Sequence, residues 1–121
     1  MKYEFKIIVF SNDPSFAMSL ASECDKYDFM LAFVDHVDNI KNEIGKSTIA
    51  VLLVDLNEKA INPFKLCQKI KKCYELPVFG VLNMFSKSVQ EKAKKSGYDL
   101  IFTKKMLLRS IREVVIHVSN E

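Results

Sequence analysis

Residues 49–54 read IAVLLV, a run of six apolar residues that Asp55 ends. A short apolar run without polar alternation is typical of a central strand in a parallel sheet, where helices cover both faces. The run is far shorter than the roughly 18 apolar residues of a membrane-spanning helix. We therefore expect the Asp55 carboxylate at the carboxyl end of a buried strand, where it either orders the following loop or acts as an acceptor or ligand.

Four more short apolar segments lie on either side of this run, and amphipathic segments separate them. Strands are predicted over residues 5–10, 29–34, 49–54, 76–82 and 100–103. Apolar residues at helical spacing follow each strand, over residues 14–24, 36–44, 63–74, 89–96 and 107–118. The chain therefore alternates strand and helix five times.

Capping residues mark where the predicted helices begin and end. Asp13-Pro14 and Asn62-Pro63 each combine a good N-cap with a proline at the first helical position. Asp35 is expected to cap the short helix that follows it, and the sequence 88–91, SVQE, matches a capping box. Gly97 is expected to end that helix.

This alternation predicts the fold class. Buried strands that alternate with amphipathic helices imply a parallel sheet with helices on both faces. For five repeats we expect an α/β, flavodoxin-like, doubly wound (βα)5 three-layer sandwich, with a five-stranded parallel sheet in the order 2-1-3-4-5. The 121 residues are expected to form one domain, 1–121. Sites in such folds lie at the carboxyl ends of the strands, here Ser11–Asp13, Asp55, Leu82–Asn83 and Lys104.

Composition excludes several classes of protein. With 49% hydrophobic and 27% charged residues, the sequence is typical of a globular protein and not of a disordered one. The first residues lack the apolar stretch of a signal peptide, so a cytoplasmic location without membrane contact is expected. Three cysteines at no metal-ligand spacing argue against a disulfide framework and a zinc site. The absence of GxGxxG and GKS/GKT argues against a nucleotide-binding loop.

The net charge of +3 hides an asymmetry along the chain. Residues 1–60 hold six Lys and ten Asp/Glu, a net charge of −4. Residues 61–121 hold twelve Lys/Arg and five Asp/Glu, a net charge of +7. If the two halves lie on different sides of the fold, the molecule is dipolar and suited to a charged partner.

Four segments in order give the chain a resemblance to a known family, the receiver domains of bacterial two-component response regulators, typified by the small chemotaxis response regulator. The family's first strand and its acid-bearing loop are similar to residues 7–16. Its phosphoacceptor segment is similar to residues 51–57, and the start of its fourth strand to residues 76–78. Residues 97–104, GYDLIFTK, are similar to its G-x-D-x-x-x-x-K stretch. The resemblance covers residues 5–118. It implies a role in two-component signal transduction or a phosphorelay, with Asp55 at the phosphoacceptor position and Lys104 at the family's lysine position.

The sequence departs from this family where the metal would bind. The family carries two acids after its first strand that bind Mg²⁺, and here those positions hold Ser11 and Asn12. Only the neighbouring Asp13 is acidic, and we expect it to cap the helix that begins at Pro14 in preference to binding a metal. Mg²⁺ requires hard, charged oxygen ligands in octahedral geometry. The resemblance therefore predicts a degenerate metal site at Ser11, Asn12 and Asp13, with no cofactor or at most weakly bound Mg²⁺.

The sequence also departs from the family at its switch residues. The family's fourth strand ends in Thr or Ser, which hydrogen-bonds the acyl phosphate, and here that position holds Leu82. The family's mobile aromatic residue in the fifth strand is replaced by Ile101, while Phe102 is expected to point to the opposite face. With the acids gone, we expect Lys104 to pair directly with Asp55 and to hold the site in one state. These departures predict a degenerate pseudo-receiver that is not an enzyme.

A fold without switch chemistry would act through its surfaces. In the family, the face made by the last two helices and the strand between them commonly contacts partners or a second copy. Here residues 87–112 carry many cations, among which we single out Lys92, Lys95, Lys105 and Arg109 as a candidate surface for an acidic protein partner or a homodimer. Met84-Phe85 either supplies an apolar anchor at this face or packs under the following helix.

Three alternatives to this interaction domain remain open. The first is a receiver that still accepts a phosphoryl group on Asp55, with Asp13 and Asp55 holding a weak metal. The second is nucleic-acid binding through the basic second half, although no recognition motif with interleaved aromatics is present. The third is another flavodoxin-like enzyme, although no nucleophile–base pair or Gly-rich phosphate loop supports it.

Overall fold

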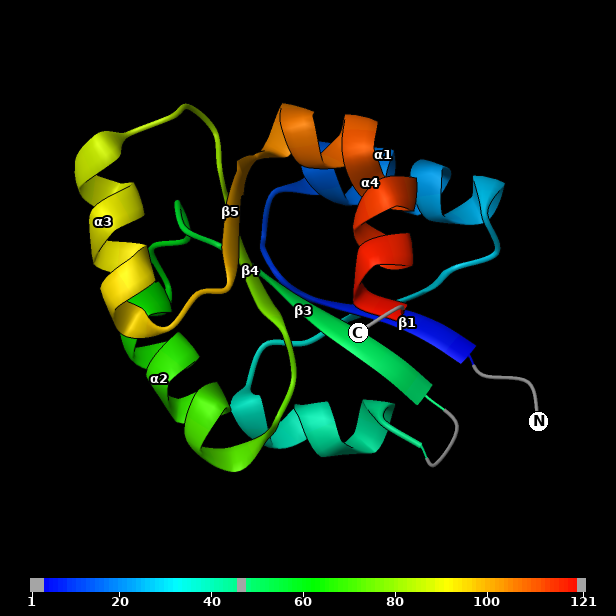
Figure 1. Ribbon diagram of the computed structural model, residues 1–121, viewed down its shortest axis with the longest axis horizontal. Helices are drawn as coiled ribbons and strands as arrows, with labels where there is room; N and C mark the ends of the chain where they lie inside the picture. The colour runs from blue at the N-terminus through cyan, green and yellow to red at the C-terminus, as the bar shows by residue number, and fades with distance from the viewer. Residues whose placement is uncertain (1–3, 46–47, 120–121) are drawn as a thin grey trace.

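The computed structural model describes residues 4–45 and 48–119. Strands and helices alternate along the chain (Figure 1): β1 (Glu4–Phe10), α1 (Pro14–Lys26), β2 (Met30–Phe33), the 3-10 helix η1 (Val37–Glu43), β3 (Thr48–Asp55), α2 (Pro63–Cys73), β4 (Val78–Leu82), α3 (Lys87–Ser96), β5 (Leu100–Thr103) and α4 (Lys104–Ser119). In the described parts of the chain, no helix is both long and apolar enough to cross a bilayer.

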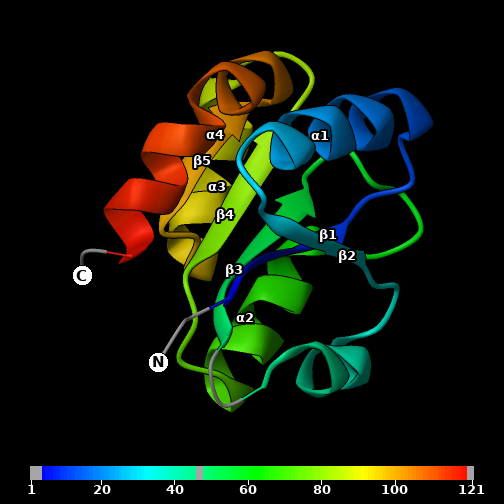
Figure 2. The same ribbon diagram turned by 90° about the vertical axis from the view of Figure 1, so that its right-hand side faces the viewer.

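The five strands form one parallel sheet in the order β2-β1-β3-β4-β5, as the sequence predicted. Helices α1 and α4 pack on one face, where Leu20 and Leu107 meet Val51 and other residues of the sheet. On the opposite face, η1, α2 and α3 cover Leu52 and its neighbours. Figure 2 shows the sheet between these two layers. The run 49–54 lies at the centre of the sandwich, because β3 pairs with both β1 and β4.

The predicted caps of α1 and α2 are confirmed. The side chain of Asp13 accepts hydrogen bonds from two backbone N–H groups of α1, and Asn62 does the same for α2. Both prolines occupy the first turn, where a backbone N–H is not needed. The chain direction after β1 and after the β3–α2 loop is therefore set by local sequence.

Two predicted caps were wrong. The segment after β2 forms a 3-10 helix whose N-cap is His36, because its Nδ1 accepts from the Asp38 N–H at 3.1 Å. Asp35, the residue predicted for that role, instead binds the Asn39 side chain. Helix α3 begins two residues earlier than the capping-box pattern indicated, because Ser86 caps it by accepting from the Val89 N–H.

Gly97 ends α3 in the left-handed region, with φ of 108°. Its replacement by Ala is expected to lower the free energy of unfolding by about 1–2 kcal/mol, because an L side chain is strained at this φ. Urea unfolding measures the difference. Asp28→Gly is the matched control: Asp28 has a φ of 57°, so glycine there should leave stability unchanged or raise it. Unchanged stability in Gly97→Ala would contradict the assignment of Gly97 as a required cap.

Candidate functional site

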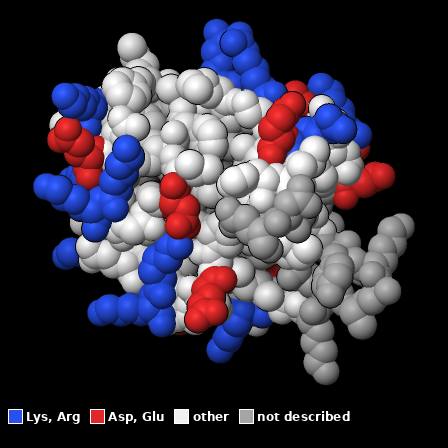
Figure 3. Space-filling view, in the orientation of Figure 1, with Lys and Arg blue, Asp and Glu red and all other residues white. Residues whose placement is uncertain are grey.

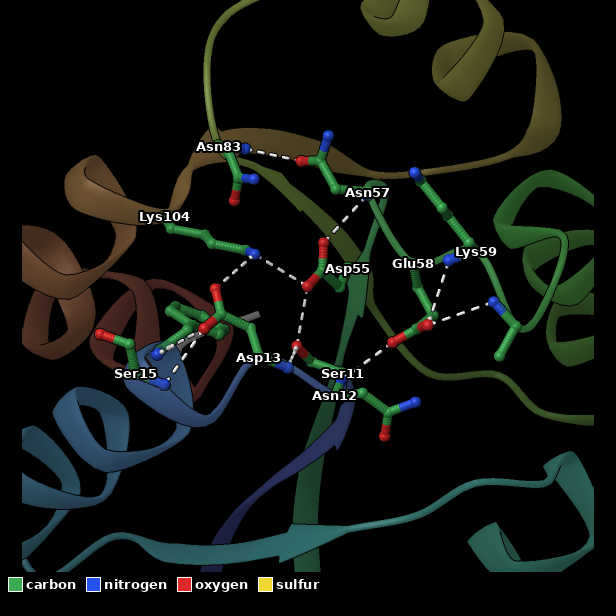
Figure 4. A network of polar contacts seen from close by, with 12 residues as sticks. Ser11, Asn12, Asp13, Ser15, Asp55, Asn57, Glu58, Lys59, Asn83 and Lys104 are labelled. Atoms are coloured by element: carbon green, nitrogen blue, oxygen red, sulfur yellow. Dashed lines mark hydrogen bonds and ion pairs between the residues drawn. The ribbon is translucent and has the colours of Figure 1, made fainter.

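Asp55 lies at the carboxyl end of β3 and is only 3% exposed. Its Oδ1 accepts from the backbone N–H of Asn57 at 2.9 Å. Its Oδ2 accepts from the Ser11 hydroxyl at 2.8 Å and lies 2.8 Å from the Lys104 ammonium nitrogen. Both carboxylate oxygens are therefore occupied by protein groups (Figure 4).

Lys104 connects two acids at this edge. It follows the last residue of β5 directly, as the sequence predicted, and is the first residue of α4; it is 8% exposed. Its Nζ lies 2.9 Å from Asp13 Oδ2 in addition to its contact with Asp55, and it sits 5.4 Å from the centre of the Phe16 ring. Burial alone would lower the pKa of Lys104, but hydrogen bonds and charge interactions with Asp55 and Asp13 outweigh burial and raise it. The ammonium is therefore charged at neutral pH and balanced by the two carboxylates.

Asp13 performs two tasks with its two oxygens. Oδ1 accepts from the Ser15 and Phe16 N–H groups and caps α1, which confirms the expected capping role. Oδ2 binds Lys104, a contact that the sequence did not indicate. The hydrogen bond from Lys104, followed by that from the Phe16 N–H, lowers the pKa of Asp13. Asp13 therefore belongs to the site as a partner of Lys104.

The lowered pKa of Asp13 predicts a pH-dependent contribution to stability. This contribution is present above the ordinary pKa of 3.8 and is lost as the pH falls through the lowered value. Asp13→Asn keeps a capping oxygen but removes the charge that pairs with Lys104. At pH 7 it is expected to lower the free energy of unfolding by about 0.5–1 kcal/mol, the usual contribution of a partly exposed ion pair. Urea unfolding of both proteins at pH 7 and pH 2.5 should show a smaller difference in the free energy of unfolding at the lower pH. A difference of equal size at both pH values would mean that the substitution acts through the shape of the side chain and not through its charge.

Ser11 and Asn12 occupy the positions where the resemblance placed metal-binding acids. The Ser11 hydroxyl donates to Asp55 and accepts from the Asp13 N–H at 3.2 Å. The Asn12 side chain is exposed, while its backbone N–H donates to Glu58 Oε2 at 2.9 Å. The same Glu58 carboxylate accepts from two backbone N–H groups in its own loop, those of Lys59 and Ala60. Glu58 thus ties the β1–α1 loop to the β3–α2 loop.

In the arrangement observed, with Lys104 and Ser11 on Asp55 Oδ2, these residues do not fit a Mg²⁺ ion. A metal at Asp55 Oδ2 would compete with the Lys104 ammonium and the Ser11 hydroxyl proton, both of which already point at that oxygen. Within residues 4–45 and 48–119, no group of three or more His, Cys, Asp or Glu side chains is arranged to hold a metal ion. The donor set also supplies neutral oxygens where Mg²⁺ prefers carboxylates.

The positions of the expected switch residues are filled by core side chains. Leu82 is 3% exposed and packs in the core on the α2 and α3 side of the sheet, with Ile101 packed against the same core. Phe102 packs on the opposite face, where its ring centre lies 5.9 Å from that of Phe79, as the alternation predicted. Asn83 contributes its backbone N–H, which donates to Asn57 Oδ1 at 2.7 Å. This contact fixes the β4–α3 loop against the β3–α2 loop.

The candidate partner surface is only partly contiguous. Lys92, Lys95, Lys105 and Arg109 are all exposed. Lys92, however, holds its Nζ 4.5 Å from the centre of the Phe64 ring of α2, so its ammonium group lies over α2. Figure 3 views the face of α3, β5 and α4: Lys and Arg gather along its left side over α3, and the surface over β5 carries few charges.

Met84 and Phe85 resolve one alternative that the sequence left open. Their exposed fractions are 80% and 66%, so neither residue packs under α3. Met106, in the first turn of α4, is 56% exposed. The loop and helix beside the site therefore present apolar side chains to solvent.

Comparison with known proteins identifies the fold. No protein-family model and no curated protein matches the sequence. Among solved structures, a two-component response regulator from Clostridium difficile has a TM-score of 0.77 at 14% identity, covering 98% of this chain and 100% of that one. A CheY-like response regulator receiver domain protein from Methanospirillum hungatei JF-1 has a TM-score of 0.73 at 14% identity, covering 97% and 98%. The signal receiver domain of the putative response regulator NarL from Mycobacterium tuberculosis has a TM-score of 0.73 at 10% identity, covering 94% and 98%.

The chain therefore has the fold of response regulator receiver domains, the family that its sequence resembles. Asp55 and Lys104, singled out from the sequence, meet at the carboxyl edge of that fold. The structure also adds two residues that the sequence did not assign to the site, Asn57 and Glu58, while the expected Asn83 reaches Asn57 through its backbone N–H. Their only sequence signal is that they follow the strand ends.

Proposed function

We propose that this chain is a pseudo-receiver, an atypical two-component receiver domain that acts in signal transduction by phosphorylation-independent protein–protein interaction. One observation carries the proposal: Lys104 and Ser11 both occupy Asp55 Oδ2, at distances of 2.8 Å each. In this proposal the protein is a cytoplasmic binding module that needs no cofactor, and it is not an enzyme.

The chemistry of phosphoryl transfer supports this proposal. Transfer to a carboxylate needs a free oxygen as the attacking atom and cations that neutralise the charge on the transferred group. Here Asp55 Oδ1 accepts from the Asn57 N–H, and Oδ2 accepts from two further groups. Attack would require Asp55 to give up part of this network, and the positions of the metal-binding acids hold Ser11 and Asn12.

A second candidate function has its own support. Asp55 and Lys104 remain together at the edge where receiver chemistry would take place. In this alternative, Asp55 accepts a phosphoryl group, Lys104 moves with the added charge, and Asp13 with Asp55 binds Mg²⁺ weakly. The two candidates differ in whether the site responds to Mg²⁺ and to a mimic of the acyl phosphate.

An amide NMR titration separates the two candidates. The protein is titrated with Mg²⁺ to 20 mM and then with beryllofluoride, which mimics an acyl phosphate. We expect no shifts centred on Asp55, Asn57 and Lys104. Shifts at these residues that disappear in an Asp55→Asn control would overturn the pseudo-receiver and establish the phosphorylatable receiver.

The docking surface in this proposal lies along α3, β5 and α4. The exposed cations Lys95, Lys105 and Arg109 would steer an acidic protein toward it, and exposed Met106 would supply apolar contact area. Because none of these side chains belongs to the Asp55 network, binding here would not require phosphorylation.

A further inference from the structure

Opposite edges of the sheet carry opposite charge. β2 and β5 are the two outer strands, so the segments around them lie at opposite edges of the sheet (Figure 2). Residues 23–43, which contain β2, hold six Asp/Glu and two Lys, a net charge of −4. Residues 87–112, which contain α3, β5 and the first half of α4, hold eight Lys/Arg and two Asp/Glu, a net charge of +6. The charge asymmetry of the sequence is therefore a dipole across the sheet.

Each edge also exposes apolar side chains among its charges. We define the acidic edge as exposed Asp25, Asp28, Asp35 and Asp38 with the β2 residues Met30 (41% exposed) and Phe33 (48% exposed). We define the basic edge as exposed Lys95, Lys105, Arg109 and Arg112 with Leu100 (41% exposed) and Met106 (56% exposed). An apolar centre with a charged rim is the usual composition of a protein interface.

We propose that the acidic edge of one copy docks on the basic edge of a second copy, head to tail. This inference rests on the proposed function, because it names the acidic partner of the surface along α3, β5 and α4. The two edges are complementary in charge, and both present apolar area that a complex would bury. A symmetric contact would instead place like charges opposite each other, which costs binding energy at either edge.

The symmetry of this contact predicts how the assembly behaves. A head-to-tail contact uses two different surfaces, so each added copy leaves one acidic and one basic edge open. The assembly should therefore extend with protein concentration and not stop at a dimer. Salt should weaken it, because the Debye length falls from about 10 Å at 0.1 M salt to about 3 Å at 1 M.

Analytical ultracentrifugation of the wild-type protein is the first test. At about 0.5 mM protein in 25 mM NaCl, we expect the weight-average mass to exceed twice the 13.9 kDa of one chain. In 500 mM NaCl it should return to 13.9 kDa. A monomer at both salt concentrations would overturn the proposal.

Charge-reversal variants identify the edges. The acidic-edge variant is Asp35→Lys with Asp38→Lys, and the basic-edge variant is Lys95→Glu with Lys105→Glu and Arg109→Glu. Each variant should sediment as a monomer alone. An equimolar mixture retains one intact contact, between the acidic edge of one variant and the basic edge of the other. The mixture should therefore form a dimer and no longer species.

A control with matched charge excludes a general effect of net charge. Lys65, Lys69 and Lys72 are exposed on α2, and their replacement by Glu changes the net charge by the same amount as the basic-edge variant. This control should still associate like the wild type, and loss of association in it would overturn the proposal. The proposal would also fail if only the basic-edge variant lost association and mixing did not restore it, since that result indicates a symmetric contact. None of these outcomes depends on the response to Mg²⁺ and beryllofluoride, so failure here is distinct from failure of the pseudo-receiver assignment.

Discussion

Replacement of Lys104 by Met is expected to lower the free energy of unfolding by about 3 kcal/mol, because it leaves a buried carboxylate without its cation. Asp55 is 3% exposed, and the Met side chain would fill much of the volume of Lys104 without supplying a positive charge or a hydrogen-bond donor. Asp13 would lose the same partner. Urea unfolding at pH 7 measures the loss. Because the pKa of Lys104 is raised above its ordinary 10.5, the contribution is fully present below that pH and is lost only as the pH rises past the raised value.

Two further variants show whether the ion pair is the cause. Lys105→Met removes the neighbouring exposed ammonium and should change stability by less than about 0.5 kcal/mol. Adding Asp55→Asn to Lys104→Met removes the stranded charge, so the double variant should be more stable than Lys104→Met alone. Two results would contradict a site held together by the Lys104–Asp55 pair. One is a loss of less than about 1 kcal/mol in the free energy of unfolding for Lys104→Met. The other is a double variant that is less stable than Lys104→Met alone.

Restoring acids beside Asp55 is expected to create a Mg²⁺ site. In the variant Ser11→Asp with Asn12→Asp, three carboxylates would lie at the carboxyl ends of β1 and β3, and Mg²⁺ would relieve their repulsion. If the variant binds Mg²⁺ with a Kd of about 1 mM, 20 mM Mg²⁺ should stabilise it by about 2 kcal/mol through mass action. Thermal unfolding with and without Mg²⁺ measures this gain, and the wild type should show none.

The control for this second prediction is Asp55→Asn in the same double-acid background. It should lose most of the stabilisation by Mg²⁺, because the new site needs the carboxylate of Asp55. Stabilisation of the wild type by the same Mg²⁺ concentration would mean that Ser11 and Asn12 do not prevent metal binding. Stabilisation that survives Asp55→Asn would place the ion elsewhere.

The fold could be predicted because its signals are local. The run 49–54 indicates a buried strand by composition alone, and Asp13-Pro14 indicates a helix start within two residues. His36 was missed as a cap because a ring nitrogen rarely takes that role, and Ser86 was missed because Ser88 offers a competing pattern two residues later. Strand order followed from the number of repeats, which is a topological rule and not a property of any one segment.

The site was predictable only in part, because its contacts join distant segments. Asp55 and Lys104 stood out by their position at strand ends, and their pairing followed from the loss of neighbouring acids. The hydrogen bond from Ser11 to Asp55 spans 44 positions, and that from Lys104 to Asp13 spans 91. No local pattern encodes where the hydroxyl of Ser11 points or that Glu58 reaches the Asn12 N–H.

The shared use of Asp55 Oδ2 by Lys104 and Ser11 has a consequence for how strongly such a domain binds its partners. When the competent conformation is a minor one, the apparent dissociation constant is the intrinsic one divided by the competent fraction. A conventional switch raises that fraction only after modification. In the proposed pseudo-receiver a single arrangement is populated throughout, so the fraction is close to one and no conformational energy is spent on binding. Occupancy would then follow the abundance of the protein and its partners, and a cell would regulate this domain by synthesis and degradation.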